Sequence, residues 1–199
     1  MKVVKFGGSS LASGKQIEKV FNIVNADPER KIIVVSAPGK RFSEDDKVTD
    51  LLIACAEKRI LGEAADDLAE AVLDRYGQIA DELELGPEIK DIIREDLFTR
   101  LSSDTHNPEA FLDLIKASGE DNNAKLVAAY FQQQGIEARY VSPKEAGLLV
   151  SPEPGNAQVL PEAYDKLLAL REQDGIIIFP GFFGYSRDGQ VFTFSRSGS

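Results

Sequence analysis

The first ten residues, MKVVKFGGSS, constrain the fold of this chain more than any other stretch. Val3, Val4 and Phe6 form a short apolar run around one cation, Lys5, and the run ends at Gly-Gly-Ser-Ser. An apolar, β-branched run that stops at such residues predicts a buried strand followed by a turn with an exposed backbone. Glycines in that turn allow a ligand to approach the main chain closely, and consecutive backbone N–H groups can then bind an anion.

Two interpretations of this turn remain open on these ten residues alone. In the first, the ammonium group of Lys5 at the end of the strand neutralises a phosphoryl group bound at the turn. In the second, the segment is a tight connection between a strand and a helix, and Lys5 is solvated. The patterns of the Rossmann fingerprint and of the Walker loop are both absent, so neither motif decides between the two.

A helix and a second strand are expected after the turn. Apolar residues at helical spacing mark one face of the helix: Ile17, Val20, Phe21 and Val24. Residues 31–35, KIIVV, then form a second buried strand that ends at the loop Ser36-Ala37-Pro38-Gly39. The order strand–helix–strand predicts parallel strands joined by a right-handed crossover. Because ligands bind at the carboxyl ends of such strands, the loops 7–10 and 36–39 are expected to share one rim of the sheet.

The composition limits the partners of the chain. With 199 residues, of which 43% are hydrophobic, it is long enough for one sizeable globular domain. A net charge of −10 argues against nucleic acid or an anionic membrane as a partner, but it does not exclude small phosphorylated ligands. The sequence contains no leader-like segment and no apolar run of membrane-spanning length, so we expect a cytoplasmic protein. One cysteine and one histidine allow neither an internal disulfide nor a Cys/His metal cluster.

The stretch after the second loop predicts a helix that begins near the rim. Its apolar stripe has helical spacing: Val48, Leu51, Leu52 and Cys55. Because Cys55 lies on this stripe, we interpret it as a small core residue rather than a nucleophile. Thr49 lies off the stripe, near the start of the helix and close to the predicted rim.

The middle of the chain is expected to contain a helical hairpin packed beside the sheet. Two amphipathic stretches within residues 62–105 are separated by Gly86-Pro87, and no strand pattern interrupts them. His106 stands in the loop that follows, where Asn107-Pro108 is expected to start the next helix. Since no serine or cysteine motif accompanies His106, we interpret it as structural.

Residues 117–121, ASGED, predict a junction or a kink between two helical stretches, because a glycine interrupts the apolar pattern. Glu120 would then be an acid in the first turn of a helix, where the helix dipole favours a negative charge.

The rest of the chain continues the α/β pattern. Strands are expected at 137–141 and 175–179, with a helix from Pro161 between them. Arg187-Asp188-Gly189 between two short apolar runs predicts a β-hairpin. The sequence stops at SRSGS directly after a strand, where a loop leading into another helix is expected, so we predict that the chain is part of a longer domain.

Several segments, taken in order, resemble the aspartokinase family. They are KFGGSS after the first strand, VVSAPGK after the second, then VTDLL, SGE, FPGFFG and finally SRSGS. Each segment is weak alone, but the set is specific and runs the whole length of the chain. The resemblance implies an α/β protein with the amino-acid kinase (carbamate kinase-like) fold, a mainly parallel sheet between helical layers, here truncated. This fold agrees with the strand–helix–strand pattern.

The resemblance implies transfer of the γ-phosphoryl group of ATP, with Mg²⁺ carried by the nucleotide, to the side-chain carboxylate of L-aspartate, the first step of lysine, threonine and methionine biosynthesis. That carboxylate, with a pKa of about 3.9, is already ionised at neutral pH and needs no general base. The reaction needs positioning and charge neutralisation instead. By resemblance, Lys5 is the catalytic cation that stabilises the phosphoryl group, and Gly7, Gly8 and Ser9 offer backbone N–H donors to the phosphates.

Six residues match positions of the family's aspartate site: Ser36, Thr49, Glu120, Phe182, Arg196 and Ser199. The resemblance implies that Glu120 holds the substrate's ammonium group. It also implies that Arg196 binds the α-carboxylate, because a planar guanidinium can bond both oxygens. No metal ligands are implied among these residues.

The resemblance also implies a domain organisation. Residues 1–199 would form the N-terminal, amino-acid-binding part of a kinase domain, with a helical insertion at about 62–105. The nucleotide-binding half and the regulatory ACT domains are absent from the sequence, and the full-length protein would be a homo-oligomer. We therefore expect the chain to keep much of the aspartate site but to bind ATP poorly. The final aspartate of the family's Gly-Arg-Gly-Gly-Ser-Asp motif is missing, and Ser195 and Ser197 replace glycines of that motif.

Three other functions are alternatives for a chain with these features. Another kinase of the same fold, acting on glutamate, acetylglutamate or a nucleotide, shares the glycine turn, but the SGE and SRSGS segments and the helical insertion count against it. A non-catalytic module that binds an amino acid or serves in assembly remains an alternative. A Rossmann oxidoreductase is a poor match because the dinucleotide-binding spacing is missing.

Overall fold

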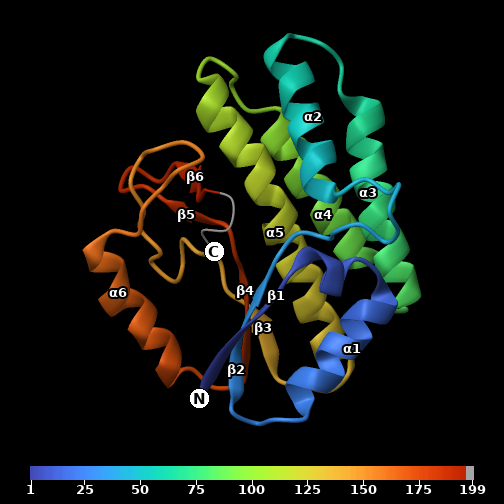
Figure 1. Cartoon of the computed structure of the whole chain (residues 1–199), viewed down its shortest axis with the longest axis vertical. Coiled ribbons are helices and arrows are strands. Elements are labelled where there is room, and N and C mark those ends of the chain that lie inside the picture. Colours follow the sequence, from blue (N-terminus) through green and yellow to red (C-terminus); the bar gives the residue numbers. More distant parts are fainter. Residues whose placement is uncertain (196–199) are drawn as a thin grey trace.

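A four-stranded parallel sheet organises the molecule (Figure 1). The computed structural model describes residues 1–195. In spatial order the strands are β1 (Lys2–Phe6), β2 (Arg30–Val35), β4 (Ile176–Pro180) and β3 (Ala138–Tyr140). Lys5 is in register with Val34, which is in turn in register with Phe179. The prediction of parallel strands is thus confirmed, and the carboxyl ends of β1 and β2 lie at one edge of the sheet.

The connection from β1 to β2 is a 3₁₀ turn, η1 (Gly8–Leu11), followed by the helix α1 (Gly14–Asn25). The side chain of Ser13 caps α1 by accepting a hydrogen bond from the backbone N–H of Gln16. The predicted apolar stripe of α1 packs against the sheet through Ile17, Val20 and Val24, which are all buried. Hydrophobic spacing therefore identified both this helix and its buried face.

Helices cover the two faces of the sheet with separate cores. On one face, α1 and α5 (Pro108–Gln133) pack over Ile33, Val35 and Ile178. On the other, α6 (Pro161–Leu168) and the segment 146–150 pack over Ile32, Ile177 and Phe179. This α/β arrangement of helices around a parallel sheet is the predicted fold class.

Three further helices extend the first core beyond the sheet, as the upper part of Figure 1 shows. They are α2 (Val48–Ile60), α3 (Asp66–Glu82) and α4 (Pro87–Leu101). The last two form the predicted hairpin, and Pro87 begins α4 as its first residue. Cys55 on α2 is fully buried in this core, and burial raises the pKa of its thiol to about 11. Its interpretation as a core residue is therefore confirmed.

The helix α5 corrects the prediction of a kink at residues 117–121, because it runs without interruption for 26 residues. Gly119 lies in its interior for a packing reason. A Cβ atom at that position would approach the Cβ of Ala37 to 2.9 Å and the Cδ1 of Leu52 to 3.1 Å. Glu120 is consequently a buried residue in the middle of a helix, and its assignment to a first turn is wrong.

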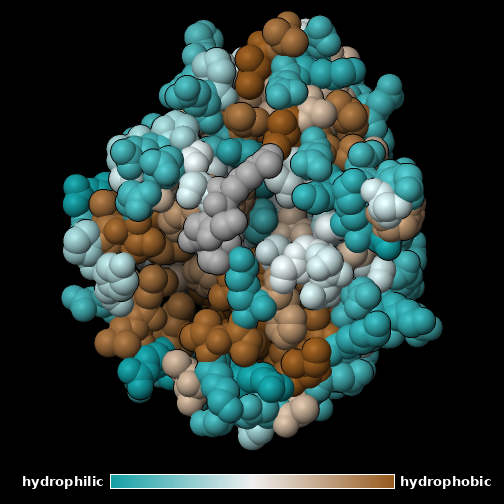
Figure 2. Space-filling model, in the orientation of Figure 1, coloured by the Kyte–Doolittle hydropathy of each residue, from teal (hydrophilic) through white to brown (hydrophobic). Residues whose placement is uncertain are grey.

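The strand β1 corrects a second prediction, since it is not buried. It lies at the edge of the sheet, and Val3 is 60% exposed. Val3 shares a face with Ile32 of β2, and that face is covered by α6 only farther along the sheet. Figure 2 shows apolar surface around α6 and the sheet on this side of the molecule, where Tyr164 and Leu168 of α6 are also exposed.

A short antiparallel hairpin follows β4. It consists of β5 (Phe183–Tyr185) and β6 (Val191–Thr193), with the predicted turn at Arg187-Asp188-Gly189 between them. Gly189 has a φ of 84°, a left-handed conformation that glycine adopts without strain. No helix within residues 1–195 is both long enough and apolar enough to cross a membrane.

Candidate functional site

The two small-residue loops meet at the carboxyl ends of β1 and β2, as the sequence predicts. The backbone N–H of Gly39 donates to the carbonyl oxygen of Gly8 at 2.8 Å, and that of Ser36 donates to Phe6 at 3.2 Å. A Cβ atom on Gly39 would lie only 2.6 Å from the carbonyl carbon of Gly8, and one on Gly8 would lie 2.9 Å from the oxygen of Ala37. Both positions need glycine because the two backbones are in direct contact.

Two adjoining cavities lie at this rim. The first, of about 430 Å³, lies over the loops and is lined in part by Gly8, Ser9 and Ser36. The second, of about 480 Å³, lies between α2, α5 and the residues around the hairpin, and Phe182 lines it. Three residues line both cavities: Lys47, Thr49 and Glu120. The predicted site residues Ser36, Thr49, Glu120 and Phe182 are therefore brought together.

Glu120 is the most unusual group of this site. It is 6% exposed, and its Oε2 atom has no hydrogen-bond partner among residues 1–195. Burial raises the pKa of its carboxyl to about 7, although a hydrogen bond from the Ala37 backbone and the charges of Lys5 and Lys116 act in the opposite direction. A buried carboxylate with an unpaired oxygen is costly unless a donor or a cation reaches it. The site therefore suits a ligand that carries an ammonium group.

Lys5 and Gly7 lie at the border of the site rather than in its lining. The side chain of Lys5 is exposed at the edge strand β1, and its charge acts on Glu120. A Cβ atom on Gly7 would meet no atom within 4 Å, so the backbone there is open. Of the residues expected to bind phosphate, Gly8 and Ser9 are the two that line the first cavity.

Phe182 holds a left-handed backbone conformation, with a φ of 76°, which is rare for a residue with a bulky side chain. Its carbonyl oxygen accepts a hydrogen bond from the N–H of Phe194 at 2.8 Å, and its ring lies 5.9 Å from the Nζ atom of Lys116. Such strain is typical of functional positions that the surrounding structure fixes. Phe182 thus forms a fixed wall of the second cavity.

The structure adds three residues to this site that sequence reasoning missed. Asp113 is buried and accepts hydrogen bonds from the N–H and the hydroxyl of Thr193, both at 2.8 Å. Lys116 forms an ion pair with Asp113 at 2.6 Å and lines the second cavity. Lys47 lines both cavities. The spacing of Asp113, Lys116 and Glu120 by three and four residues was the available signal, but the predicted kink obscured it.

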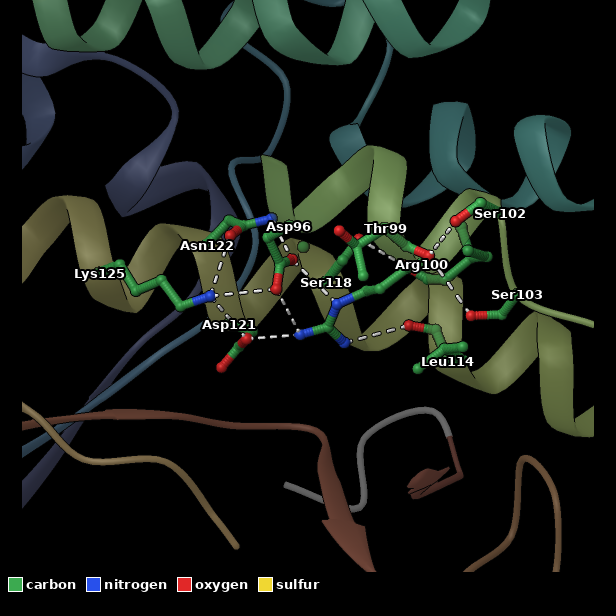
Figure 3. Close-up of polar contacts among 12 residues, drawn as sticks. Asp96, Thr99, Arg100, Ser102, Ser103, Leu114, Ser118, Asp121, Asn122 and Lys125 are labelled. Carbon is green, nitrogen blue, oxygen red and sulfur yellow. Dashed lines mark hydrogen bonds and ion pairs between the residues drawn. The ribbon is translucent and has the colours of Figure 1, made fainter. Parts of the chain in front are cut away.

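A second charged cluster occupies the neighbouring face of α5 (Figure 3). Arg100 of α4 contacts Asp121 at 2.6 Å and Asp96 at 2.9 Å. Lys125 lies 3.1 Å from Asp121, which also accepts a hydrogen bond from the hydroxyl of Tyr140. Because these opposite charges are paired among the described residues, the cluster joins α4, α5 and β3 and is interpreted as structural.

Two predicted site residues, Arg196 and Ser199, lie outside the described residues, and their roles stay predictions. His106 is exposed in the predicted loop beside Asp104, with which it makes a contact. Asn107 caps α5 by accepting a hydrogen bond from Ala110, so the predicted start of that helix is confirmed.

The sheet topology, the two glycine loops and the buried acid between them define an α/β protein with a ligand site at the carboxyl ends of its strands. A sequence model of the amino acid kinase family matches residues 1–198. The chain therefore belongs to the amino acid kinase family.

Within that family the chain is similar to aspartokinases. It is 67% identical to aspartokinase 3 of Bacillus subtilis over 199 residues, which is 100% of this chain and 44% of the relative. A crystal structure of aspartate kinase from Clostridium acetobutylicum superposes with a TM-score of 0.81 at 30% identity, over 98% of this chain and 42% of that one. The chain thus spans less than half the length of these relatives.

A more distant structure shares the fold. Aspartokinase III of E. coli in complex with aspartate and ADP superposes with a TM-score of 0.79 at 22% identity, over 98% of this chain and 44% of that chain. This likeness supports the predicted amino-acid kinase fold.

Proposed function

We propose that this chain forms the aspartate-binding side of an aspartokinase, which transfers the γ-phosphoryl group of ATP to the side-chain carboxylate of L-aspartate. One observation carries the proposal: in the part of the chain that the structure describes, the buried carboxylate of Glu120 leaves one oxygen unpaired where two cavities adjoin. The high identity to an aspartokinase over the whole chain supports the choice of substrate.

In this proposal the substrate's ammonium group pairs with Glu120. A bound cation favours the ionised carboxylate, so binding shifts the equilibrium of a group whose pKa is raised by burial to about 7 in the free protein. Ser36 and Thr49 line the site around the substrate, and Phe182 forms a wall of the second cavity. Arg196 would bind the α-carboxylate, and Ser199 would complete the pocket.

The phosphoryl group is assigned to the side of the site nearest β1. The transferring group and the attacking carboxylate are both anionic, so the chief requirement is to hold them close together and neutralise their charge. Lys5 supplies a cation at the carboxyl end of β1, and backbone N–H groups of Gly7, Gly8 and Ser9 are the donors. ATP enters as a substrate and carries Mg²⁺ with it. A homo-oligomeric, cytoplasmic enzyme of lysine biosynthesis belongs to the same proposal.

Calorimetry with L-aspartate tests the amino-acid side directly. We expect binding that strengthens as the pH rises through about 7, because the ionised form of Glu120 is the one that attracts an ammonium group. Glu120→Gln should weaken it about tenfold or more, since a charge-assisted hydrogen bond contributes about 1.5–3 kcal/mol. Glu109→Gln is the matched control, because Glu109 is exposed in the first turn of the same helix. Equal affinity of wild type and Glu120→Gln would contradict the proposal.

A non-catalytic amino-acid-binding module is the second candidate, and the share of the relatives that the chain spans keeps it open. Titration with ATP, and a hydroxamate assay for acyl phosphate with ATP and Mg²⁺, separate the two. Aspartate binding without ATP binding or acyl phosphate favours a module within these residues. Preference for glutamate over aspartate would instead indicate another amino-acid kinase.

A further inference from the structure

Helix α3 of the helical hairpin reaches the rim of the site through a buried arginine. Arg75 is 4% exposed, and its Nη1 atom lies 2.6 Å from Oδ2 of Asp45. Its Nη2 atom donates to the carbonyl oxygen of Ala12 at 3.3 Å and also to that of Gly39. One side chain therefore bonds the end of the first glycine loop, the end of the second, and the segment that leads into α2.

The same helix makes two more contacts of this kind. Its last residue, Glu82, accepts a hydrogen bond from the backbone N–H of Gly14 at 2.7 Å, at the start of α1. The hydroxyl of Tyr76 donates to the carbonyl oxygen of Gly119 at 2.6 Å, beside Glu120. Three side chains of α3 thus make four hydrogen bonds to backbone atoms, two of them from Arg75.

We propose that Arg75 is a positioning residue that sets the spacing between the two glycine loops, and so the shape of the first cavity. The expected effect of Arg75 on substrate binding rests on the proposed function, whereas its effect on the spacing of the loops does not. Gly39 is held from two sides, because its N–H bonds Gly8 and its carbonyl oxygen bonds Arg75. Loss of Arg75 would leave the contact between the two glycines as the remaining bond between the loops at that point.

The chemistry of the side chain supports a role that another cation cannot fill. A guanidinium group is a planar fork with five donors, so it can reach Ala12, Gly39 and Asp45 together, whereas an ammonium group is a compact point charge. Asp45 balances the buried charge and is itself held by Arg41. The hydrogen bond from Arg41, opposed by burial, lowers the pKa of Asp45 far below its usual value, so Asp45 is an anion at neutral pH.

Hydrogen exchange of individual backbone amides tests the proposal without any ligand. In Arg75→Lys, the amide of Gly39 is expected to exchange at least tenfold faster than in wild type, with a smaller increase at Ser10, whose N–H bonds Gly7. Arg94→Lys is the matched control. Arg94 bonds Glu70 at 2.8 Å and so joins α4 to α3 as well, but at the surface and away from the loops.

A second control separates positioning from a general loss of stability. Leu97→Ala removes a buried side chain of α4 from the helical core. Positioning predicts faster exchange confined to the loops in Arg75→Lys and spread over the helices in Leu97→Ala. An unchanged Gly39 amide, or the same pattern in both variants, would overturn the proposal. If Arg75→Lys does not fold, Asp45→Asn, which keeps the guanidinium group and removes its counter-charge, is expected to give a weaker change at the same amides.

Aspartate affinity then gives a functional readout. Because displacement by about 1 Å can cost up to 100-fold in a positioned reaction, we expect Arg75→Lys to bind aspartate about tenfold more weakly. If the wild-type chain also fails to bind aspartate, the proposed function is refuted, and the hydrogen-exchange result alone decides the role of Arg75. Unchanged affinity with a faster Gly39 amide would limit Arg75 to holding the loops and refute its effect on the site.

Discussion

Two adjacent residues of α5, Glu120 and Asp121, show how one helix serves two different purposes. Both are acids and both are buried. Asp121 lies 2.6 Å from a guanidinium nitrogen of Arg100 and 3.1 Å from the ammonium of Lys125, and it accepts a hydrogen bond from Tyr140. Glu120, one position earlier, lines the two cavities at the rim, and one of its oxygens has no partner in the described part of the chain.

Burial alone therefore does not distinguish a binding residue from a structural one. Removing a carboxylate from water costs free energy in both cases, and only one of the two acids recovers it within the described residues. An unpaired oxygen that adjoins two cavities implies a partner from solution, whereas a fully paired acid implies a joint between elements. Removal of a partner of Asp121 should therefore lower the stability of the protein, whereas replacement of Glu120 by a neutral residue should raise it at neutral pH.

The largest effect is expected from the paired acid. Arg100→Met should lower the free energy of unfolding by about 3–5 kcal/mol, because it leaves the buried Asp121 and the half-buried Asp96 with less compensation. Chemical denaturation measures the change. Arg94→Met is the matched control, since its ion pair with Glu70 is exposed and should contribute less than about 1 kcal/mol. Equal losses of unfolding free energy in both variants would show that the buried cluster contributes no more to stability than an exposed ion pair.

Glu120, in contrast, should destabilise the folded protein as it ionises with rising pH. Burial raises the pKa of Glu120 from 4.5 to about 7, so the folded state binds a proton that the unfolded chain releases in that window. The free energy of unfolding should therefore fall as pH rises from 4.5 to about 7, by up to about 3 kcal/mol from this group.

Glu120→Gln removes this titration. Relative to wild type, the variant should gain stability as the pH rises through the same window and keep that gain above it. Denaturation at a series of pH values, with Glu109→Gln as control, measures the difference. A constant difference between Glu120→Gln and wild type at every pH would mean that Glu120 titrates normally.

The sequence predicted the parts of the site that depend on local pattern. A run of β-branched residues before KFGGSS, a helical stripe and a second apolar run were sufficient to predict parallel strands and a shared rim. The position of the loops follows from this topology, so the sequence alone predicts that Gly8, Ser9 and Ser36 lie close together.

Other features depend on contacts between distant segments, and the sequence could not supply them. The edge position of β1 follows from the order of all four strands, so the exposure of Val3 was not foreseen. The bond from Arg75 to Gly39 joins residues 36 positions apart. Arg75 stands on a helix of the predicted hairpin, and spacing alone does not show which arginine of that hairpin turns inward.

The smallest expected effect concerns two glycines inside helices, one packed against the site and one not. Gly119 interrupts the helical pattern in the sequence, but in the structure it permits close contact between α5 and the loop 36–39. A Cβ atom at position 119 would lie 2.9 Å from the Cβ of Ala37. Gly77 in α3 is also inside a helix, yet a Cβ atom there would meet nothing within 4 Å. Alanine favours a helix over glycine by about 0.5–1 kcal/mol, whereas forcing a methyl group into a filled space costs about 1–3 kcal/mol.

Gly77→Ala should therefore stabilise the protein by about 0.5–1 kcal/mol, and Gly119→Ala should destabilise it by about 1 kcal/mol after the same helix gain is counted. The second variant should also weaken aspartate binding, because any adjustment must move Ala37 or Leu52, and the Ala37 backbone bonds Glu120. Thermal denaturation and calorimetry on the two variants measure both effects. Stabilisation by both substitutions would mean that α5 and the loop adjust freely, and that the surroundings of Glu120 are not fixed by this contact.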